Sequence, residues 1–71
     1  MGPARVKVTA NGNPVELAVG ATVEDLLRAL GLGGRWVIVE RNGQPVARTA
    51  MAATALAEGD TLELVRAVAG G

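Results

Sequence analysis

Few residues of this chain could carry out chemistry. The sequence contains no histidine and no cysteine, so it offers neither the usual nucleophile and base pairs nor a thiolate metal site. The acidic pair Glu24-Asp25 lies where a helix is expected to begin, a place that acidic side chains favour because of the helix dipole. Glu58-Gly59-Asp60 has the composition of a turn. Neither group predicts an active site, and we expect that the chain is not an enzyme.

Phosphate and nucleic acid binding are also poorly supported. A phosphate cradle needs glycines before a helix, whereas the glycine-rich stretch 31–34 follows the expected helix. Seven basic residues balance seven acidic ones, and Trp36 is the only aromatic residue, which argues against nucleic acid as a partner. No apolar run is long enough to cross a membrane, and no signal-peptide core begins the chain. A domain this small without cysteines is expected in the cytoplasm.

The α-carboxylate of Gly71 is the one group left that could react. A carboxylate is a poor electrophile until it is activated, for instance as an acyl-adenylate. To reach a nucleotide held by another protein, the last residues must pass through a narrow channel in extended form, and glycine allows close approach because it has no Cβ. We expect a flexible tail over residues 66–71, in which Arg66, Ala67, Val68 and Ala69 provide the reach and Gly70 and Gly71 enter the partner. The alternative is a frayed end without function.

Hydrophobic periodicity predicts the elements that would position this tail. Alternation with a period of two predicts strands over 5–10, 15–19, 36–41, 44–47 and 61–65. Val23, Leu26, Leu27 and Leu30 share one face of a helix, for which Thr22 is the expected N-cap and Gly31 the stop. Asn11-Gly12 and Asn42-Gly43 predict tight turns. Residues 48–57 are expected to form a loop with at most one irregular helical turn, around Ala53–Leu56.

The order strand, strand, helix, strand, short strand, strand predicts the β-grasp, or ubiquitin-like, arrangement. This is an α+β fold in which one helix packs across one face of a mixed four- to five-stranded sheet, here as a single domain over residues 1–71. The first and last strands should lie parallel in the middle. Trp36, Ile38 and Val65 then fall on the face that the helix leaves open, where they could form a docking patch. Alternatively, Trp36 folds over a rim and Ile38 is an ordinary exposed residue.

Nearly the whole chain after its first residues resembles the ThiS family of small sulfur carriers. The resemblance rests on four segments, which are NGNPVEL at Asn11–Leu17, TVEDLLRALGL at Thr22–Leu32, VIVERNGQPVAR at Val37–Arg48 and TALAEGDTLELVRAVAGG at Thr54–Gly71. A terminal Gly-Gly is shared by every ubiquitin-like carrier. Its combination with the Asn-Gly turn and the Glu-Gly-Asp turn is more specific.

The resemblance implies a carrier that donates sulfur to the thiazole of thiamin. A ThiF-like adenylating enzyme would use ATP to activate the Gly71 carboxylate, and sulfur from the cysteine persulfide of a donor enzyme would replace AMP to give a thiocarboxylate. Thiazole synthase would accept that sulfur. The carrier itself would bind no cofactor and no metal. Three alternatives stay open: a related carrier for molybdopterin, tRNA thiolation or cysteine synthesis, a modifier conjugated to lysines through Gly71, and a plain interaction module.

Overall fold

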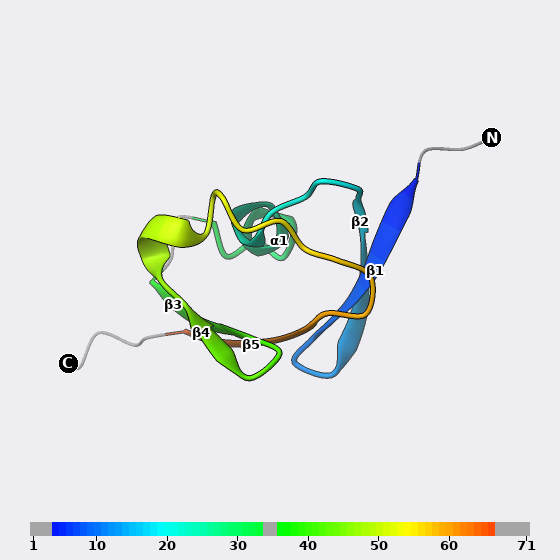
Figure 1. Cartoon of the computed structure of the whole chain (residues 1–71). Helices are drawn as coiled ribbons and strands as arrows, with labels where there is room; N and C mark the ends of the chain where they lie inside the picture. The colour runs from blue at the N-terminus through cyan, green and yellow to red at the C-terminus, as the bar shows by residue number, and fades with distance from the viewer. Residues whose placement is uncertain (1–3, 34–35, 67–71) are drawn as a thin grey trace.

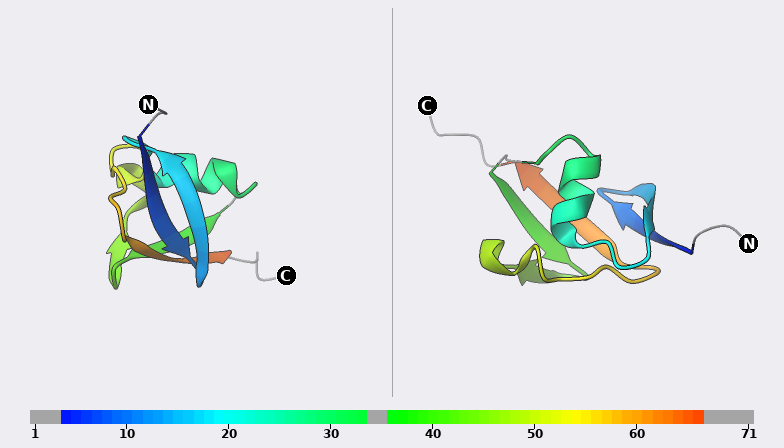
Figure 2. Two further views of the ribbon diagram at one scale, coloured as in Figure 1. Left: turned by 90° about the vertical axis from the view of Figure 1, so that its right-hand side faces the viewer. Right: turned by 90° about the horizontal axis from the view of Figure 1, so that it is seen from above.

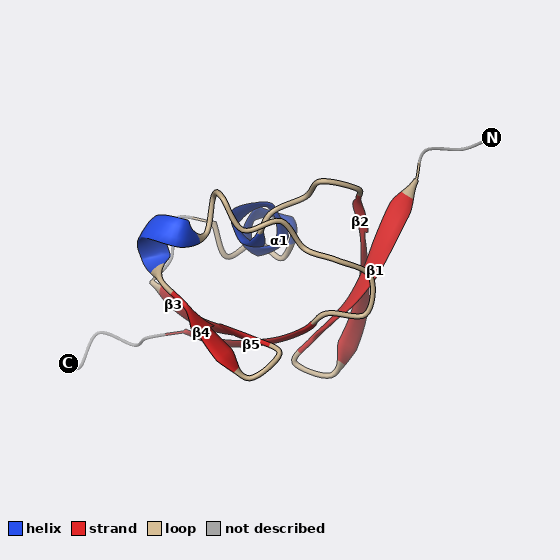
Figure 3. Cartoon of the chain, viewed as in Figure 1, coloured by secondary structure: helices blue, strands red, loops and turns tan. Residues whose placement is uncertain are grey.

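The computed structural model of the protein describes residues 4–33 and 36–66. Five strands, one α-helix and one short 3₁₀-helix follow one another along this part of the chain (Figures 1 and 3). Their bounds are β1 Arg5–Ala10, β2 Asn13–Ala18, α1 Val23–Ala29, β3 Val37–Arg41, β4 Gln44–Val46, η1 Arg48–Ala50 and β5 Thr61–Arg66.

The strands form one sheet in the order β2-β1-β5-β3-β4. β1 and β5 are parallel neighbours, and the other three pairings are antiparallel. The last strand of the chain therefore lies at the centre of the sheet, between the β1–β2 hairpin and the β3–β4 hairpin. The two views of Figure 2 show α1 lying across one face of this sheet. The predicted β-grasp architecture is confirmed, with five strands in the described part of the chain.

The start of α1 is fixed by a capping box. The Thr22 Oγ1 atom accepts a hydrogen bond from the backbone N–H of Asp25, and the Asp25 carboxylate accepts one from the backbone N–H of Thr22. The hydrogen bond from the Thr22 backbone N–H, and after it a side-chain hydrogen bond with Thr22, lower the pKa of Asp25 below its ordinary value. After α1 the chain adopts a left-handed conformation at Gly31, with a φ of 76°. Glycine takes up this conformation without steric cost, which explains why the helix ends there.

An aliphatic core fills the space between the sheet and α1. Val23 and Leu26 of the helix are fully buried against it, as is Leu62 at the centre of β5. Alternate residues of the strands contribute to this core, with Val8, Leu17, Val37, Val39, Leu62 and Leu64 buried and Val6 and Val15 half-buried. Burial of Val, Leu and Ile side chains is worth about 1.5–3 kcal/mol each, so these residues supply most of the stability.

The helical turn between β4 and β5 lies earlier than predicted, at Arg48–Ala50 instead of Ala53–Leu56. Residues 54–56 are held extended along the start of α1 instead. The Val23 N–H donates to the Thr54 carbonyl at 3.0 Å, and the Leu56 N–H donates to the Ala21 carbonyl at 2.8 Å. Because these tertiary hydrogen bonds need an extended backbone, they override the weak helical preference of this alanine-rich stretch.

The second to fifth strands also differ from their predicted bounds, by one or two residues. The second strand runs from Asn13 to Ala18 rather than over 15–19, because pairing with β1 begins directly after the turn, where Ala10 faces Asn13. Val19 is left exposed beyond the strand. The third strand begins at Val37, so Trp36 lies just outside the sheet.

Candidate functional site

The candidate site begins where β5 ends. Arg66 is the last residue of this strand, it is exposed, and it faces Val37 of β3 in the antiparallel register. The other residues expected to form the reactive tail, Ala67, Val68, Ala69, Gly70 and Gly71, lie outside the described residues. The structure thus places the base of the tail on the central strand of the sheet.

Asn11 fastens the second half of β5. Its side-chain Nδ2 donates to the Leu64 carbonyl at 3.0 Å, and its Oδ1 accepts from the Leu64 N–H at 2.8 Å. β1 ends at Ala10, so the Leu64 backbone has no β1 residue to pair with in the parallel register. The amide of Asn11 takes the place of that missing strand residue. The sequence predicts Asn11 only as a turn residue, because the partner of its side chain lies 53 positions away.

Asn42 fastens the other end of β5 in a similar way. Its Oδ1 accepts from the Thr61 N–H at 2.8 Å, and its Nδ2 donates to an Asp60 carboxylate oxygen at 2.9 Å. Asn11 and Asn42 are the two described residues other than glycine with positive φ, at 49° and 52°. Asparagine tolerates this left-handed conformation better than most residues. Each Asn-Gly dipeptide therefore closes a turn and also fastens β5.

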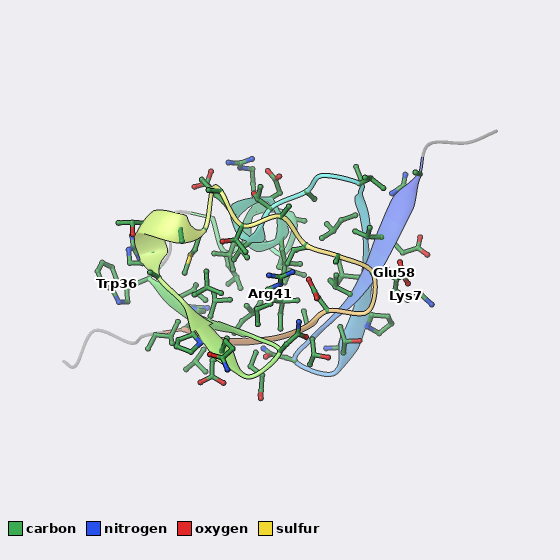
Figure 4. All side chains as sticks on the ribbon, in the orientation of Figure 1. Lys7, Trp36, Arg41 and Glu58 are labelled. Carbon is green, nitrogen blue, oxygen red and sulfur yellow. The ribbon has the colours of Figure 1, made fainter. Side chains whose placement is uncertain are left out.

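Asp60 is the buried charged group beside Asn42. Its carboxylate accepts hydrogen bonds from Arg41 Nε at 2.9 Å and from the Ala57 N–H at 2.8 Å, besides that from Asn42. Burial raises the pKa of Asp60, but the hydrogen bonds from Ala57, Asn42 and Arg41 outweigh this effect and hold it below its usual range. A fully satisfied carboxylate of this kind is a structural group. Figure 4 shows Arg41 reaching into the space between the sheet and the loop that precedes β5.

An exposed apolar patch lies on the side of the sheet away from α1, near the base of the tail. Ile38 of β3 and Val65 of β5 face each other in the register and are 54% and 60% exposed. Trp36, just before β3, is 61% exposed. On the same face of these two strands the next pair is Glu40 and Glu63, so acidic groups replace the apolar ones with increasing distance from the tail. We call Trp36, Ile38 and Val65 the outer patch.

Trp36 is tied to the short helix η1. The Arg48 guanidinium carbon lies 3.8 Å from the centroid of the Trp36 ring, which is the geometry of a cation–π contact. In Figure 4 Trp36 lies next to η1, at the end of the molecule opposite to Lys7 and Glu58. Arg48 also borders an open groove of about 550 Å³ between α1 and η1, whose apolar walls include Leu27 and Met51. The contact with Arg48 could not be foreseen, since nothing in the sequence pairs these two residues.

The described residues bring together no catalytic constellation. Within residues 4–33 and 36–66, no group of three or more acidic side chains is placed to hold a metal ion. The same part of the chain includes no helix long and apolar enough to cross a membrane. Glu24 and Asp25 pair with Arg28 on the helix surface, and Asp60 is saturated with donors. These acidic groups therefore serve structure.

Comparison with protein families places this geometry among known proteins. The model of the ThiS family matches residues 7–71, which includes the outer patch, β5 and both terminal glycines. The chain belongs to the ThiS family. The predicted membership of this family is thereby confirmed.

Solved structures agree with this assignment. The crystal structure of the thiamine biosynthesis protein ThiS from Geobacter metallireducens is 35% identical to this ThiS chain, with a TM-score of 0.76 over 93% of this chain and 100% of that one. SAMP1 from Haloferax volcanii is 26% identical, with a TM-score of 0.55 over 96% of this chain and 100% of that one. The β-grasp is thus shared with both proteins.

The curated relatives are longer proteins. The thiazole synthases of Magnetococcus marinus and Paramagnetospirillum magneticum are each 39% identical to this ThiS chain over 66 residues, which is 93% of this chain and 20% of those proteins. The chain spans about a fifth of the length of these relatives. A ThiS-like segment therefore occurs in proteins that carry the name of thiazole synthase.

Proposed function

We propose that this ThiS chain carries sulfur as a thiocarboxylate on Gly71 and delivers it to a thiazole synthase. The observation that supports the proposal most is the family match, which runs through Gly70 and Gly71, together with the position of β5 at the centre of the sheet. The likeness to segments of two thiazole synthases supports the choice of acceptor. We place the carrier itself in the cytoplasm, as expected for so small a domain without cysteines.

The proposed chemistry needs nothing from the folded body except presentation of the terminus. A ThiF-like enzyme joins the Gly71 carboxylate to AMP and releases pyrophosphate from ATP. The terminal sulfur of a protein persulfide then attacks the acyl carbon, and AMP leaves. A thiol reduces the resulting acyl disulfide and releases the thiocarboxylate. ATP is bound by the activating enzyme, and this chain binds no cofactor.

The outer patch is the surface on which we propose that these partners dock. Trp36, Ile38 and Val65 are large apolar groups exposed together, and they lie around the strand end from which the tail continues. Exposed apolar clusters mark interaction sites more often than isolated apolar residues do. A partner that covers the outer patch would thereby receive residues 67–71 at its own active site.

Mass spectrometry of the intact protein tests the proposal directly. The full chain is incubated with ATP, magnesium, a ThiF-like enzyme and a persulfide donor. We expect a mass increase equal to the difference between sulfur and oxygen, located in the C-terminal peptide. A variant that lacks Gly71 is the matched control and should stay unmodified. An unchanged mass of the full chain, with an activating enzyme that converts its own carrier, would refute the proposal.

Two variants test the outer patch separately from the tail. Val65→Lys puts a charge into the patch, and Thr61→Lys puts the same charge on the same face of β5 at its far end. We expect the first variant to raise the KM of the activating enzyme for the carrier at least tenfold and the second to leave it nearly unchanged. Equal effects of the two variants would exclude the patch as the docking surface. Adducts of higher mass on other proteins would instead favour a protein modifier.

A further inference from the structure

The Asn11 contact to β5 has a direct bearing on the tail. β5 is paired on both sides only at its start, because β1 ends at Ala10 while β5 continues to Arg66. On the β3 side, pairing continues to the end of β5, where Arg66 faces Val37. On the β1 side, the Asn11 side chain provides the contact to Leu64, two residues before Arg66. On its β1 side, the end of β5 is therefore held by the side chain of Asn11 instead of by a neighbouring strand.

The two hydrogen bonds of Asn11 are arranged as in a strand pair. One goes to the N–H and the other to the carbonyl of the same residue, at 2.8 and 3.0 Å. The Asn11 N–H adds a third bond to β5, to the Leu62 carbonyl at 2.9 Å. Together they fix Leu62 and Leu64 against the end of β1. Fixing a backbone in one conformation lowers its entropy. The end of β5 loses this entropy when the protein folds, so it is not lost again when the carrier binds the activating enzyme.

We propose that Asn11 is a positioning residue of this carrier, which sets the direction in which β5 delivers residues 67–71 to the activating enzyme. The inference rests on the proposed function of Gly71. A tail whose base is already oriented loses less freedom when its terminus is aligned with the bound nucleotide, so activation is faster for a given affinity of docking. Asn11 touches neither substrate nor nucleotide, and it acts through the backbone of Leu64.

Asn42 provides a matched control within the same molecule. It is also followed by glycine, it has nearly the same positive φ, and its side chain also makes two hydrogen bonds. It fastens the start of β5 at Thr61, at the opposite end from the tail. Glycine accepts positive φ without strain, so Asn11→Gly and Asn42→Gly each remove two side-chain hydrogen bonds and keep the turn. Asn42→Gly also removes a hydrogen bond to the Asp60 carboxylate, so it should lose at least as much stability as Asn11→Gly, whereas only Asn11→Gly should affect the base of the tail.

The experiment measures kcat/KM for adenylation of the full chain, with the carrier as varied substrate, at a temperature where both variants are folded. We expect a loss of about tenfold for Asn11→Gly, equivalent to about 1.4 kcal/mol, and less than twofold for Asn42→Gly. Hydrogen exchange in the same samples should show faster exchange of the Leu64 amide in the first variant and of the Thr61 amide in the second. Asn11→Asp serves as a second variant, because it keeps the acceptor for the Leu64 N–H and loses the donor to the carbonyl. We expect it to show the same direction of change.

Each outcome decides between distinct claims. Equal kcat/KM for the two glycine variants, or an unchanged value for Asn11→Gly while its Leu64 amide exchanges faster, would overturn the positioning role. Unchanged exchange at Leu64 would overturn the contact itself. If the wild-type chain is not adenylated at all, the proposed function fails and the inference fails with it, which the wild-type reference reveals before any variant is compared.

Discussion

Replacing Asp60 by asparagine should remove a large part of the stability of this fold. Asp60 is only 6% exposed, and its carboxylate accepts three hydrogen bonds, one of them from the Arg41 guanidinium. The Oδ2 atom accepts hydrogen bonds from Arg41 and Ala57, and the Oδ1 atom accepts one from Asn42. An asparagine has only one acceptor oxygen, so its NH₂ group must face a donor on one of the two sides. The change therefore breaks at least one hydrogen bond and leaves the Arg41 charge without its partner.

The expected loss follows from these contacts. A hydrogen bond to a charged group contributes about 1.5–3 kcal/mol and a neutral one about 1 kcal/mol, so Asp60→Asn should cost roughly 3 kcal/mol. For 71 residues the total free energy of unfolding is expected to be roughly 4–10 kcal/mol. A loss of this size lowers the melting temperature of so small a domain by roughly 12–24 °C. Chemical denaturation followed by far-UV circular dichroism measures the loss in free energy of unfolding. Glu63→Gln, on the exposed face of β5, is the control.

The pH dependence provides an independent check. The pKa of Asp60 in the folded state lies below its ordinary value. Its stabilising contribution is therefore complete above the pKa of the unfolded chain and is lost as the pH falls through the lower folded pKa. The stability difference between wild type and Asp60→Asn should be constant above about pH 5 and shrink below about pH 4. A difference below about 0.5 kcal/mol at neutral pH, or one that does not shrink in acid, would refute this account of Asp60.

Three further predictions concern the helix, the core and the outer patch. Thr22→Ala removes the side-chain half of the capping box and should cost about 1 kcal/mol in thermal unfolding, whereas Thr22→Ser should be close to wild type. Leu26→Ala opens a cavity at a fully buried position and should cost about 2–5 kcal/mol, enough to populate unfolded chains that ANS fluorescence and protease sensitivity would detect. Trp36→Ala loses an exposed contact with Arg48 worth about 0.5–1 kcal/mol, so a small effect on stability is expected together with a raised KM for the activating enzyme. A large loss of stability with unchanged KM would show that Trp36 serves the fold and not docking.

Patterns local in the sequence predicted most of the fold. The three buried apolar positions of α1 (Val23, Leu26 and Leu27), its N-cap and the glycine that follows define the helix without reference to the rest of the chain, although Leu30, predicted on the same face, is the exposed C-cap. Period-two alternation likewise assigns the core-facing residues of each strand, because side chains on a strand must point to alternate faces. The central position of β5 followed from general rules on how strands connect.

Features that depend on distant partners could not be predicted. The side-chain hydrogen bonds of Asn11 join residues 53 positions apart. The bond between Asn42 and Thr61 and the bond between Arg41 and Asp60 each join residues 19 positions apart. Nothing in the local pattern indicates that a turn asparagine also binds a strand. The misplaced helical turn has the same origin, since residues 54–56 are held by the start of α1. For the candidate site, the sequence predicted the outer patch and the tail, and the residue that fastens the base of the tail became visible only in the structure.

The central position of β5 also has a consequence for how this protein folds during synthesis. The β1–β2 and β3–β4 hairpins are local and can form early, but the described sheet has no pairing between one hairpin and the other except through β5. Because β5 is the last of the five described strands to be synthesised, the sheet cannot join the two hairpins until β5 has left the ribosome. Folding is therefore completed from the C-terminal side, and a nascent chain stalled before β5 would expose both halves of the core to chaperones and proteases.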